Sequence, residues 1–311
     1  MTNVALKPEM LEKPMNRSRL SEFFSRLVKT KPLGTLCGCI ILFLILMAIL
    51  APYISPYPYI EVHPPDRLQG MSSKYFLGTD QLGRDLFSRL LFGARISLGV
   101  GLAATAVDIV VSFIVGGASG FLGRKYDLIM QRFVDAWIAF PGLLLLLTVM
   151  SVSGKGIPQL IFVLGISGGI SGSRIVRAAV IGIKENDYFL AAFAIGSDTY
   201  QTMKRHVIPN ITPVMIVIFS ITIGGMIIAE SSLSFLGFGL PAQIPSWGGM
   251  LSREGRDYME ISPGLALWPG FFLTLTVYSL NMVGDAVRDL LDPRLKSGLG
   301  GYSGTRKKLS K

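Results

Sequence analysis

The sequence predicts an all-α integral membrane protein with six transmembrane helices. Half of the 311 residues are hydrophobic and only 16% are charged, and the mean hydropathy is +0.51. Such a composition is typical of a chain whose solvent is mainly lipid. A helix that crosses about 30 Å of hydrocarbon needs roughly 20 residues, and six runs with few or no charges are near that length. They are residues 32–60, 96–123, 136–154, 156–173, 207–229 and 261–284.

These runs divide the chain into segments. The fourth run is the shortest, and we expect its helix to continue to about Ile183, with Arg174 and Arg177 at its interfacial end or facing the bundle interior. The expected boundaries are a cytoplasmic N-terminal tail (1–32), a first transmembrane helix (33–54), an outer Pro-rich segment with an amphipathic helix (55–92), a five-helix core (93–290) containing a loop at 185–209, and a cytoplasmic C-terminal tail (291–311).

The distribution of basic residues predicts the orientation, because Lys and Arg near membrane spans stay on the cytoplasmic side. With the N-terminus inside, cytoplasmic segments collect 22 of the 30 basic residues. We therefore expect both termini in the cytoplasm, with contacts to anionic lipids. Nucleic-acid binding is a poor interpretation, because the basic residues are spread over tails and loops.

The segment after the first run is rich in proline and should follow an extended, turn-rich path outside the membrane. We expect Thr79 or Asp80 to cap an amphipathic helix that runs into the second span. Asp85 and Arg89 have the spacing of a favourable i,i+4 pair on that helix.

Two carboxylates interrupt the apolar runs, Asp108 in the second and Glu230 after the fifth. A charged group is costly in lipid, so each should face protein or a water-filled path. Asp108 either lines the pathway or pairs with a basic or hydroxyl group. Glu230 either contacts substrate or anchors the turn that follows it.

The outer turn at 239–256 contains Trp247 between prolines and glycines. Trp247 could help to seat a partner protein or close an outer gate, or it could be an ordinary aromatic residue at the membrane interface.

The loop at 185–209 contains an unusually apolar helix for a membrane surface. Asn186 or Asp187 can begin it, residues 188–195 are apolar throughout, and Gly196 can end it in the left-handed conformation. Asp198 is placed to cap a second short helix. A helix that is apolar all round should be buried in its own bundle or in the groove of another protein.

The order of residues in this loop resembles the coupling loop of ATP-binding-cassette (ABC) importer permeases. Ala191 and Ala192 are followed by Gly196 and then by His206 to Pro209, although Leu190 stands where that motif has Glu. Further signatures resemble the dipeptide, oligopeptide and nickel branch, and its second or "C" type in particular. They are Leu77 to Asp80, Gly83 to Asp85, Gly93 to Arg95, Glu230 to Pro241, Pro245 to Gly248, and Asp285 to Arg294.

The resemblance implies a type I ABC importer permease fold with cytoplasmic coupling helices. It also implies a homologous second permease in a heterodimer, two ATPase subunits and an extracytoplasmic solute-binding protein. The residues implied in ATPase coupling are Asp187, Tyr188, Ala191, Ala192, Gly196, Asp198, His206 and Pro209.

We expect the chain to be no enzyme and to hold no cofactor of its own, because it lacks a phosphate-binding loop. ATP and Mg would be bound by the ATPase subunits. Only two cysteines and two histidines are present, and they indicate neither a disulfide nor a metal site.

The resemblance favours di- or oligopeptides as cargo, but nickel chelates, glutathione, opines and oligosaccharides remain alternatives. A proton-coupled secondary transporter is a hypothesis from another class, since it too would be polytopic and basic inside. Its usual signs, inverted repeats and several intramembrane carboxylates, are weak here. A membrane-embedded hydrolase is weaker still, because no catalytic cluster lies at one depth.

Overall fold

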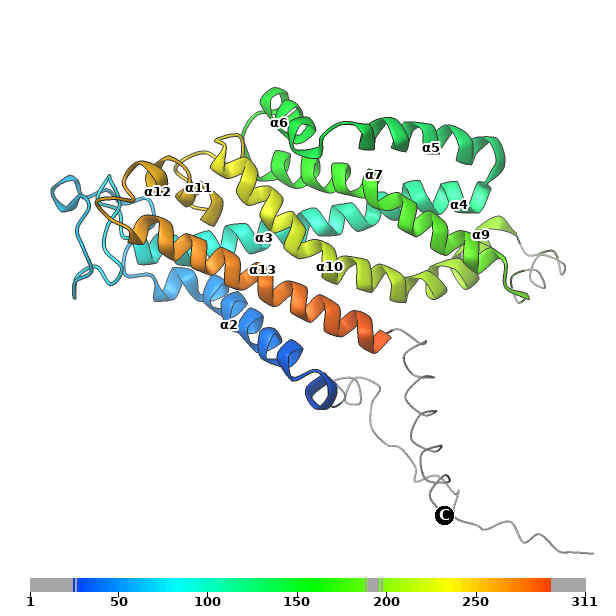
Figure 1. Cartoon of the computed structure of the whole chain (residues 1–311), viewed down its shortest axis with the longest axis horizontal. Coiled ribbons are helices and arrows are strands. Elements are labelled where there is room, and N and C mark those ends of the chain that lie inside the picture. Colours follow the sequence, from blue (N-terminus) through cyan, green and yellow to red (C-terminus); the bar gives the residue numbers. More distant parts are fainter. Residues whose placement is uncertain (1–24, 26, 188, 190–195, 197, 292–311) are drawn as a thin grey trace, which may run out of the picture.

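The computed structural model of the chain describes residues 25, 27–187, 189, 196 and 198–291. Figure 1 shows a bundle of long helices in this part of the chain. The helices are α2 (Pro32–Ile54), η1 (Pro64–Asp66), α3 (Leu86–Ser112), the π-helical η2 (Phe113–Gly117), α4 (Ala118–Leu122), α5 (Arg124–Ala139), α6 (Gly142–Ser153), α7 (Ile157–Lys184), α9 (Thr199–Thr202), the π-helical η3 (Met203–Val207), α10 (Ile208–Phe235), α11 (Trp247–Leu251), α12 (Arg253–Asp257) and α13 (Gly264–Leu291).

Within the described residues, five helical segments are long and apolar enough to cross a membrane, and the count is six if the bent pair α5 and α6 forms one span. The all-helical fold is therefore confirmed. The fourth span ends at Lys184, as its expected extension required. The α11 and α12 helices lie at one end of the bundle, and α9 lies at the other (Figure 1).

The third run is not a straight helix, which corrects the expectation for 136–154. The α5 and α6 helices are bent by 91° at the break between them. Phe140 is extended there, with ψ of 138°, because the residue before a proline is disfavoured in the helical region and Pro141 follows. If this pair is one span, it includes α5 as well as the expected run.

The outer segment is held together by two acidic residues. Asp66 accepts hydrogen bonds from Lys74 Nζ at 2.7 Å and from the Tyr75 hydroxyl at 2.8 Å. These bonds hold the pKa of the Asp66 carboxyl below its usual range. The Asp80 carboxylate accepts a hydrogen bond from Arg84 Nε at 2.6 Å and lies 3.5 Å from Arg89 Nε. These buried ion pairs fix the turn before α3.

The expected start of the helix at Thr79 or Asp80 is wrong. The α3 helix begins at Leu86, and Asp85 is its N-cap, accepting from the Ser88 backbone N–H at 2.8 Å. Asp80 is used instead to hold the preceding turn. The helix itself runs into the second span as expected, because α3 is continuous from Leu86 to Ser112.

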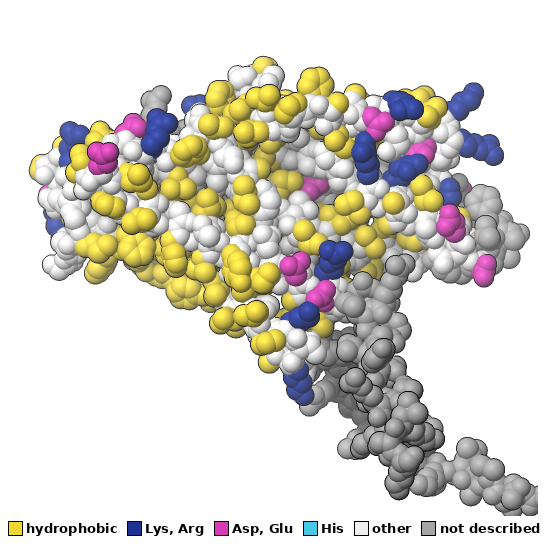
Figure 2. Space-filling model, in the orientation of Figure 1, with side chains coloured by type: hydrophobic (Ala, Val, Ile, Leu, Met, Phe, Trp, Pro, Cys, Tyr) yellow, Lys and Arg dark blue, Asp and Glu magenta, His cyan; other side chains and the backbone are white. Residues whose placement is uncertain are grey.

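The core of the bundle is the contact between the second span and α7. Adding a Cβ at Gly116 would place it 2.1 Å from the Ser173 carbonyl, and adding one at Gly169 would place it 2.5 Å from the Val111 Cβ. These glycines thus allow the two helices to approach closely. Apolar side chains gather along the lower edge of the molecule in Figure 2, where α2 exposes Leu36, Leu42 and Phe43.

Candidate functional site

The loop between α7 and α10 lies at the end of the bundle that carries α9 (Figure 1). Of the residues expected to couple to an ATPase, Tyr188, Ala191 and Ala192 fall outside the described residues. Asp187 is exposed, whereas Phe189 is only 4% exposed. The Phe189 ring packs edge-on against Phe121 with the centroids 6.3 Å apart, so the start of the loop is tied to the bundle.

The Asn186 side chain is bonded to the end of α7. Its amide nitrogen donates to the carbonyls of Gly182 at 2.9 Å and Ile183 at 3.1 Å. Asn186 therefore closes the C-terminal end of α7, where unpaired carbonyls need donors.

The second half of the loop is a continuous helical path into α10. Gly196 has φ of +80°, which confirms its left-handed conformation. Asp198 immediately precedes α9, and its carbonyl accepts from the Thr202 N–H at 2.8 Å. His206 lies in η3 and Pro209 in the first turn of α10. A displacement applied at α9 would thus be carried into the α10 span.

Glu230 is the centre of a buried polar cluster at the outer end of α10. It is 0% exposed and accepts from the hydroxyls of Ser234 at 2.8 Å, Ser97 at 3.2 Å and Ser231 at 3.3 Å. This geometry fits an anchor for the following turn. It leaves no surface for a solute in this conformation.

Trp247 is not the exposed interfacial aromatic residue that one interpretation expected, because its side chain is 0% exposed. Its indole nitrogen donates to the Leu90 carbonyl at 3.3 Å, and its ring stacks on Phe272 at 6.3 Å. The residue is buried where α3, α11 and α13 meet. It supports the outer turn from within, and a Cβ added at Gly93 would lie in tight contact with the indole, 3.2 Å away.

Asp108 is 3% exposed and lies in the contact between α3 and α7. The Ser112 hydroxyl lies 3.1 Å from its carboxylate, and a Cβ added at Gly168 would lie 3.3 Å from the carboxyl carbon. The carboxylate is therefore paired with a hydroxyl of its own helix. Glycines of α7 provide the space for it.

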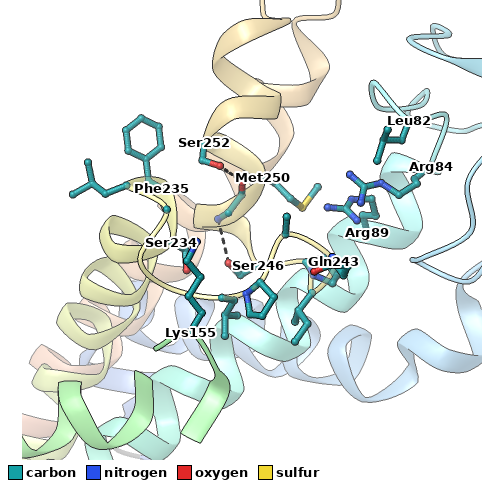
Figure 3. Close-up of a pocket in the computed structure, with 18 of the residues that line it drawn as sticks. Leu82, Arg84, Arg89, Lys155, Ser234, Phe235, Gln243, Ser246, Met250 and Ser252 are labelled. Carbon is teal, nitrogen blue, oxygen red and sulfur yellow. Dashed lines mark hydrogen bonds between the residues drawn. The ribbon is translucent and has the colours of Figure 1, made fainter. Parts of the chain in front are cut away.

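A cavity of about 660 Å³ lies at the end of the bundle that carries α11 and α12. Figure 3 shows Arg84 and Arg89 side by side on one wall, with Lys155 entering from another. Arg256 also lines the cavity, and no acidic residue is among the described residues that line it. Of these basic side chains, Arg84 and Arg89 are buried and held by Asp80. The sequence patterns did not reveal the cavity, because its residues come from three separate segments of the chain, 81–89, 155 and 234–256.

The polar contacts between α5 and α7 were also missed. Asp127 accepts from Arg177 Nε and from an Arg177 terminal nitrogen, both at 2.5 Å. Asp135 pairs with Arg174. The signal was present in the sequence, since Asp127, Gln131 and Asp135 are four residues apart and share one helix face.

Comparison with known proteins agrees with this architecture. Residues 108–297 match the family described as binding-protein-dependent transport system inner membrane component, and residues 18–70 match the N-terminal transmembrane domain of oligopeptide transport permease C. An inward-facing structure of the MetNI methionine ABC transporter aligns with a TM-score of 0.53 and 18% identity, covering 65% of this chain and 96% of that chain. That likeness concerns the fold alone.

Among curated relatives, the dipeptide transport system permease protein DppC of Alkalihalophilus pseudofirmus is 36% identical over 89% of this chain and 90% of its own. The oligopeptide transport system permease protein OppC of Bacillus subtilis is 38% identical over 83% and 84%. The glutathione transport system permease protein GsiD of Pectobacterium atrosepticum is 36% identical over 90% and 93%.

The fold and these matches define a class, the multi-pass permease subunits of ABC importers. The chain belongs to the family of binding-protein-dependent transport system inner membrane components. The type I importer fold implied by the sequence signatures is confirmed.

Proposed function

We propose that the chain is one of two homologous permease subunits of an importer for short peptides. The observation that carries the cargo assignment is the similarity to dipeptide and oligopeptide permeases over more than four fifths of the chain. Glutathione is itself a small peptide, so the similarity to a glutathione permease also fits this cargo class. Nickel chelates, opines and oligosaccharides are the other candidates.

The proposed assembly has two ATPase subunits on the side of α9 and a solute-binding protein on the opposite side. The helical continuity from Thr199 into α10 supports the cytoplasmic contact, because a rigid element can transmit a displacement of an ATPase cleft to a span. The cavity at the other end of the bundle supports the second contact, since its exposed Lys155 and Arg256 side chains can recognise acidic groups of a docking protein. The membrane-facing α2 and α13 contact lipid.

Both termini are cytoplasmic in this proposal, and the membrane is the bacterial inner membrane. The chain itself hydrolyses no ATP and holds no cofactor. Energy comes from ATP and Mg bound by the two ATPase subunits, and the permease alternates between outward-facing and inward-facing states.

Ligand binding by the cognate binding protein tests the cargo. We expect calorimetric titration with a library of di- to pentapeptides to show saturable binding, and the same peptides to be taken up by liposomes that contain the complete complex. Binding of a metal chelate or a sugar, with no response to any peptide, would refute the peptide assignment while leaving the importer architecture intact.

A further inference from the structure

The loop between α7 and α10 is attached to the bundle by an apolar cluster. Phe189 is 4% exposed and belongs to one buried cluster with Val180 of α7 and Ile211 of α10. Phe121 of α4 packs against the same cluster, and Figure 1 shows α4 at the end of the bundle that carries α9. The loop therefore contacts two spans: α10, which continues it, and the second span, which ends in α4.

The contact with the second span is made by two aromatic rings. The Phe189 and Phe121 rings meet edge to face, with an interplanar angle of 78°, an arrangement that aromatic pairs favour. The α4 backbone has little room to yield, because a Cβ added at Gly120 would lie 2.8 Å from the Arg177 carbonyl of α7. Closely packed groups transmit strain, so a displacement of the Phe189 ring is passed on to α4.

Lys184, the last residue of α7, holds Phe121 in place. Its ammonium group donates to the Phe121 carbonyl at 2.7 Å and to the Gly120 carbonyl at 3.3 Å. The last carbonyls of a helix lack partners within the helix, and a cation is favourable there. The same ammonium group lies 5.7 Å from the centroid of the Phe121 ring, within the range of a cation–π contact. Lys184 thus fixes both the backbone and the ring of the residue that Phe189 touches.

The cluster touches both spans where their helices depart from regular α geometry. Both π-helical turns in the described part of the chain place a side chain in it, Phe113 of η2 in the second span and Val207 of η3 before α10. Single π-helical turns are rare and are frequent at functional sites. The loop is therefore joined to each span next to a turn whose geometry differs from that of the rest of the helix.

We propose that Phe189 and Phe121 form a second mechanical link of the coupling loop, which passes the displacement of the ATPase subunits to the second span, and that Lys184 is a positioning residue for this link. The first link is the helical path from α9 into α10. Because α10 packs against α3 and α7, a displacement of α10 alone would have to slide it past both neighbours. With two links, the second span and α10 move together. This inference rests on the proposed function.

The amount of peptide taken up per ATP hydrolysed by the complete complex tests the link. Phe121→Ala removes one ring, and we expect it to lower this ratio about fivefold, which corresponds to the loss of one aromatic contact. Binding of the ATPase subunits should persist, because the loop itself is unchanged. Leu122→Ala is the matched control, since the neighbouring Leu122 side chain is 53% exposed. An unchanged ratio for Phe121→Ala, or equal losses of uptake, ATP hydrolysis and ATPase binding, would contradict the proposal.

The role of Lys184 is tested by two substitutions and a double variant. Lys184→Met should lower the ratio as Phe121→Ala does, and Lys184→Arg, which retains the positive charge and the donors, should restore most of it. Lys184→Met combined with Phe121→Ala should be no worse than Phe121→Ala alone, because Lys184 acts through Phe121. Additive losses in the double variant would show that Lys184 acts through other contacts and would contradict its assigned role.

A covalent bridge replaces the ring contact in a further variant. Phe121→Cys and Phe189→Cys are combined with Cys37→Ser and Cys39→Ser, so that the only two thiols of the chain lie at the link. The reduced complex should hydrolyse ATP with little uptake, and a short bifunctional thiol reagent should restore uptake. Continued loss of uptake in the cross-linked complex would show that the loop must separate from α4, and it would overturn the proposal. If the wild-type complex itself shows no ATP-driven uptake, the proposed function fails, whereas a loss confined to these variants concerns the link alone.

Discussion

The backbone N–H of Trp247 donates a hydrogen bond to the Ser97 hydroxyl over 3.2 Å. The same hydroxyl donates to the Glu230 carboxylate, also over 3.2 Å. One serine on α3 thus links the start of α11 to the end of α10. The outer turn is held by this relay and by the buried indole next to it.

Removing the Ser97 hydroxyl should loosen the outer turn. Ser97→Ala leaves a buried backbone N–H unpaired and takes one donor from Glu230, at a cost of about 1 to 3 kcal/mol. Ser232→Ala is the matched control, because Ser232 is half-buried and its hydroxyl bonds to its own helix at the Ile228 carbonyl. Thermal unfolding of the purified complex should shift for Ser97→Ala alone. Equal shifts for both variants would mean that the relay contributes nothing specific.

Truncating the indole should be more severe than removing the hydroxyl. Trp247→Ala empties a fully buried site and should destabilise the protein by about 3 to 5 kcal/mol. Trp247→Phe should cost less, because it retains the ring contact with Phe272. Tyr53→Ala, at a side chain that is 86% exposed, is the control. The yield of folded protein in detergent measures the difference, and an unchanged yield for Trp247→Ala would contradict the buried position.

The contact between the second span and α7 should tolerate no side chain at Gly116. Gly116→Ala would press a methyl group to 2.1 Å from the Ser173 carbonyl, and we expect a loss of about 1 to 3 kcal/mol from the strain. Gly99→Ala lies on the same span with nothing within 4 Å of the added atom. It should be neutral or stabilising. Comparable melting temperatures for the two variants would show that the helices can separate without cost.

How far the sequence predicts this molecule depends on the kind of interaction involved. The spans and the left-handed Gly196 follow from local chemistry, and so does the extension of the fourth span to Lys184. The start of α3 does not, because Asp80 and Asp85 are both good N-caps and the choice depends on which of them meets Arg84 and Arg89. Phe140 and Pro141 are a local signal for the 91° bend. The continuous apolar run at 136–154 nevertheless favoured the prediction of a single helix.

In the candidate site, too, local features could be predicted from the sequence and long-range contacts could not. Glu230 could be identified as a costly carboxylate, whereas its serine partner Ser97 lies 133 positions away and no local pattern joins them. Burial of Trp247 depends on α3 and α13 meeting around it. Aromatic residues near the end of a span are equally common at membrane interfaces, so composition did not distinguish the two positions.

Gly196 tests the coupling loop. Gly196→Val places a β-branched residue at φ of +80°, which costs about 1 to 3 kcal/mol through backbone strain alone, because nothing lies within 4 Å of the added Cβ. Gly196→Asn is the control, since asparagine adopts this conformation more readily. We expect Gly196→Val to insert in the membrane but retain little ATPase subunit on an affinity column. Full retention and normal uptake would show that the turn is not needed for coupling.

Topology is tested by single cysteines in a variant without Cys37 and Cys39. Cysteines at Gln69 and Gln243 should react with an impermeant thiol reagent added to intact cells, whereas one at Gln201 should not, because it lies at the end with α9. All three positions are exposed in the single chain. Labelling of Gln201 from outside would reverse the orientation inferred from the basic residues.

The source of energy is the most direct test of the account, because it separates an ABC importer from a proton-coupled transporter. The complete complex is reconstituted in liposomes with the binding protein and labelled peptide outside. ATP and Mg are enclosed in one set of liposomes, and the other set has an imposed proton gradient without ATP. We predict uptake against a gradient only where ATP is enclosed and the binding protein is present. Uptake driven by the proton gradient alone would contradict the account.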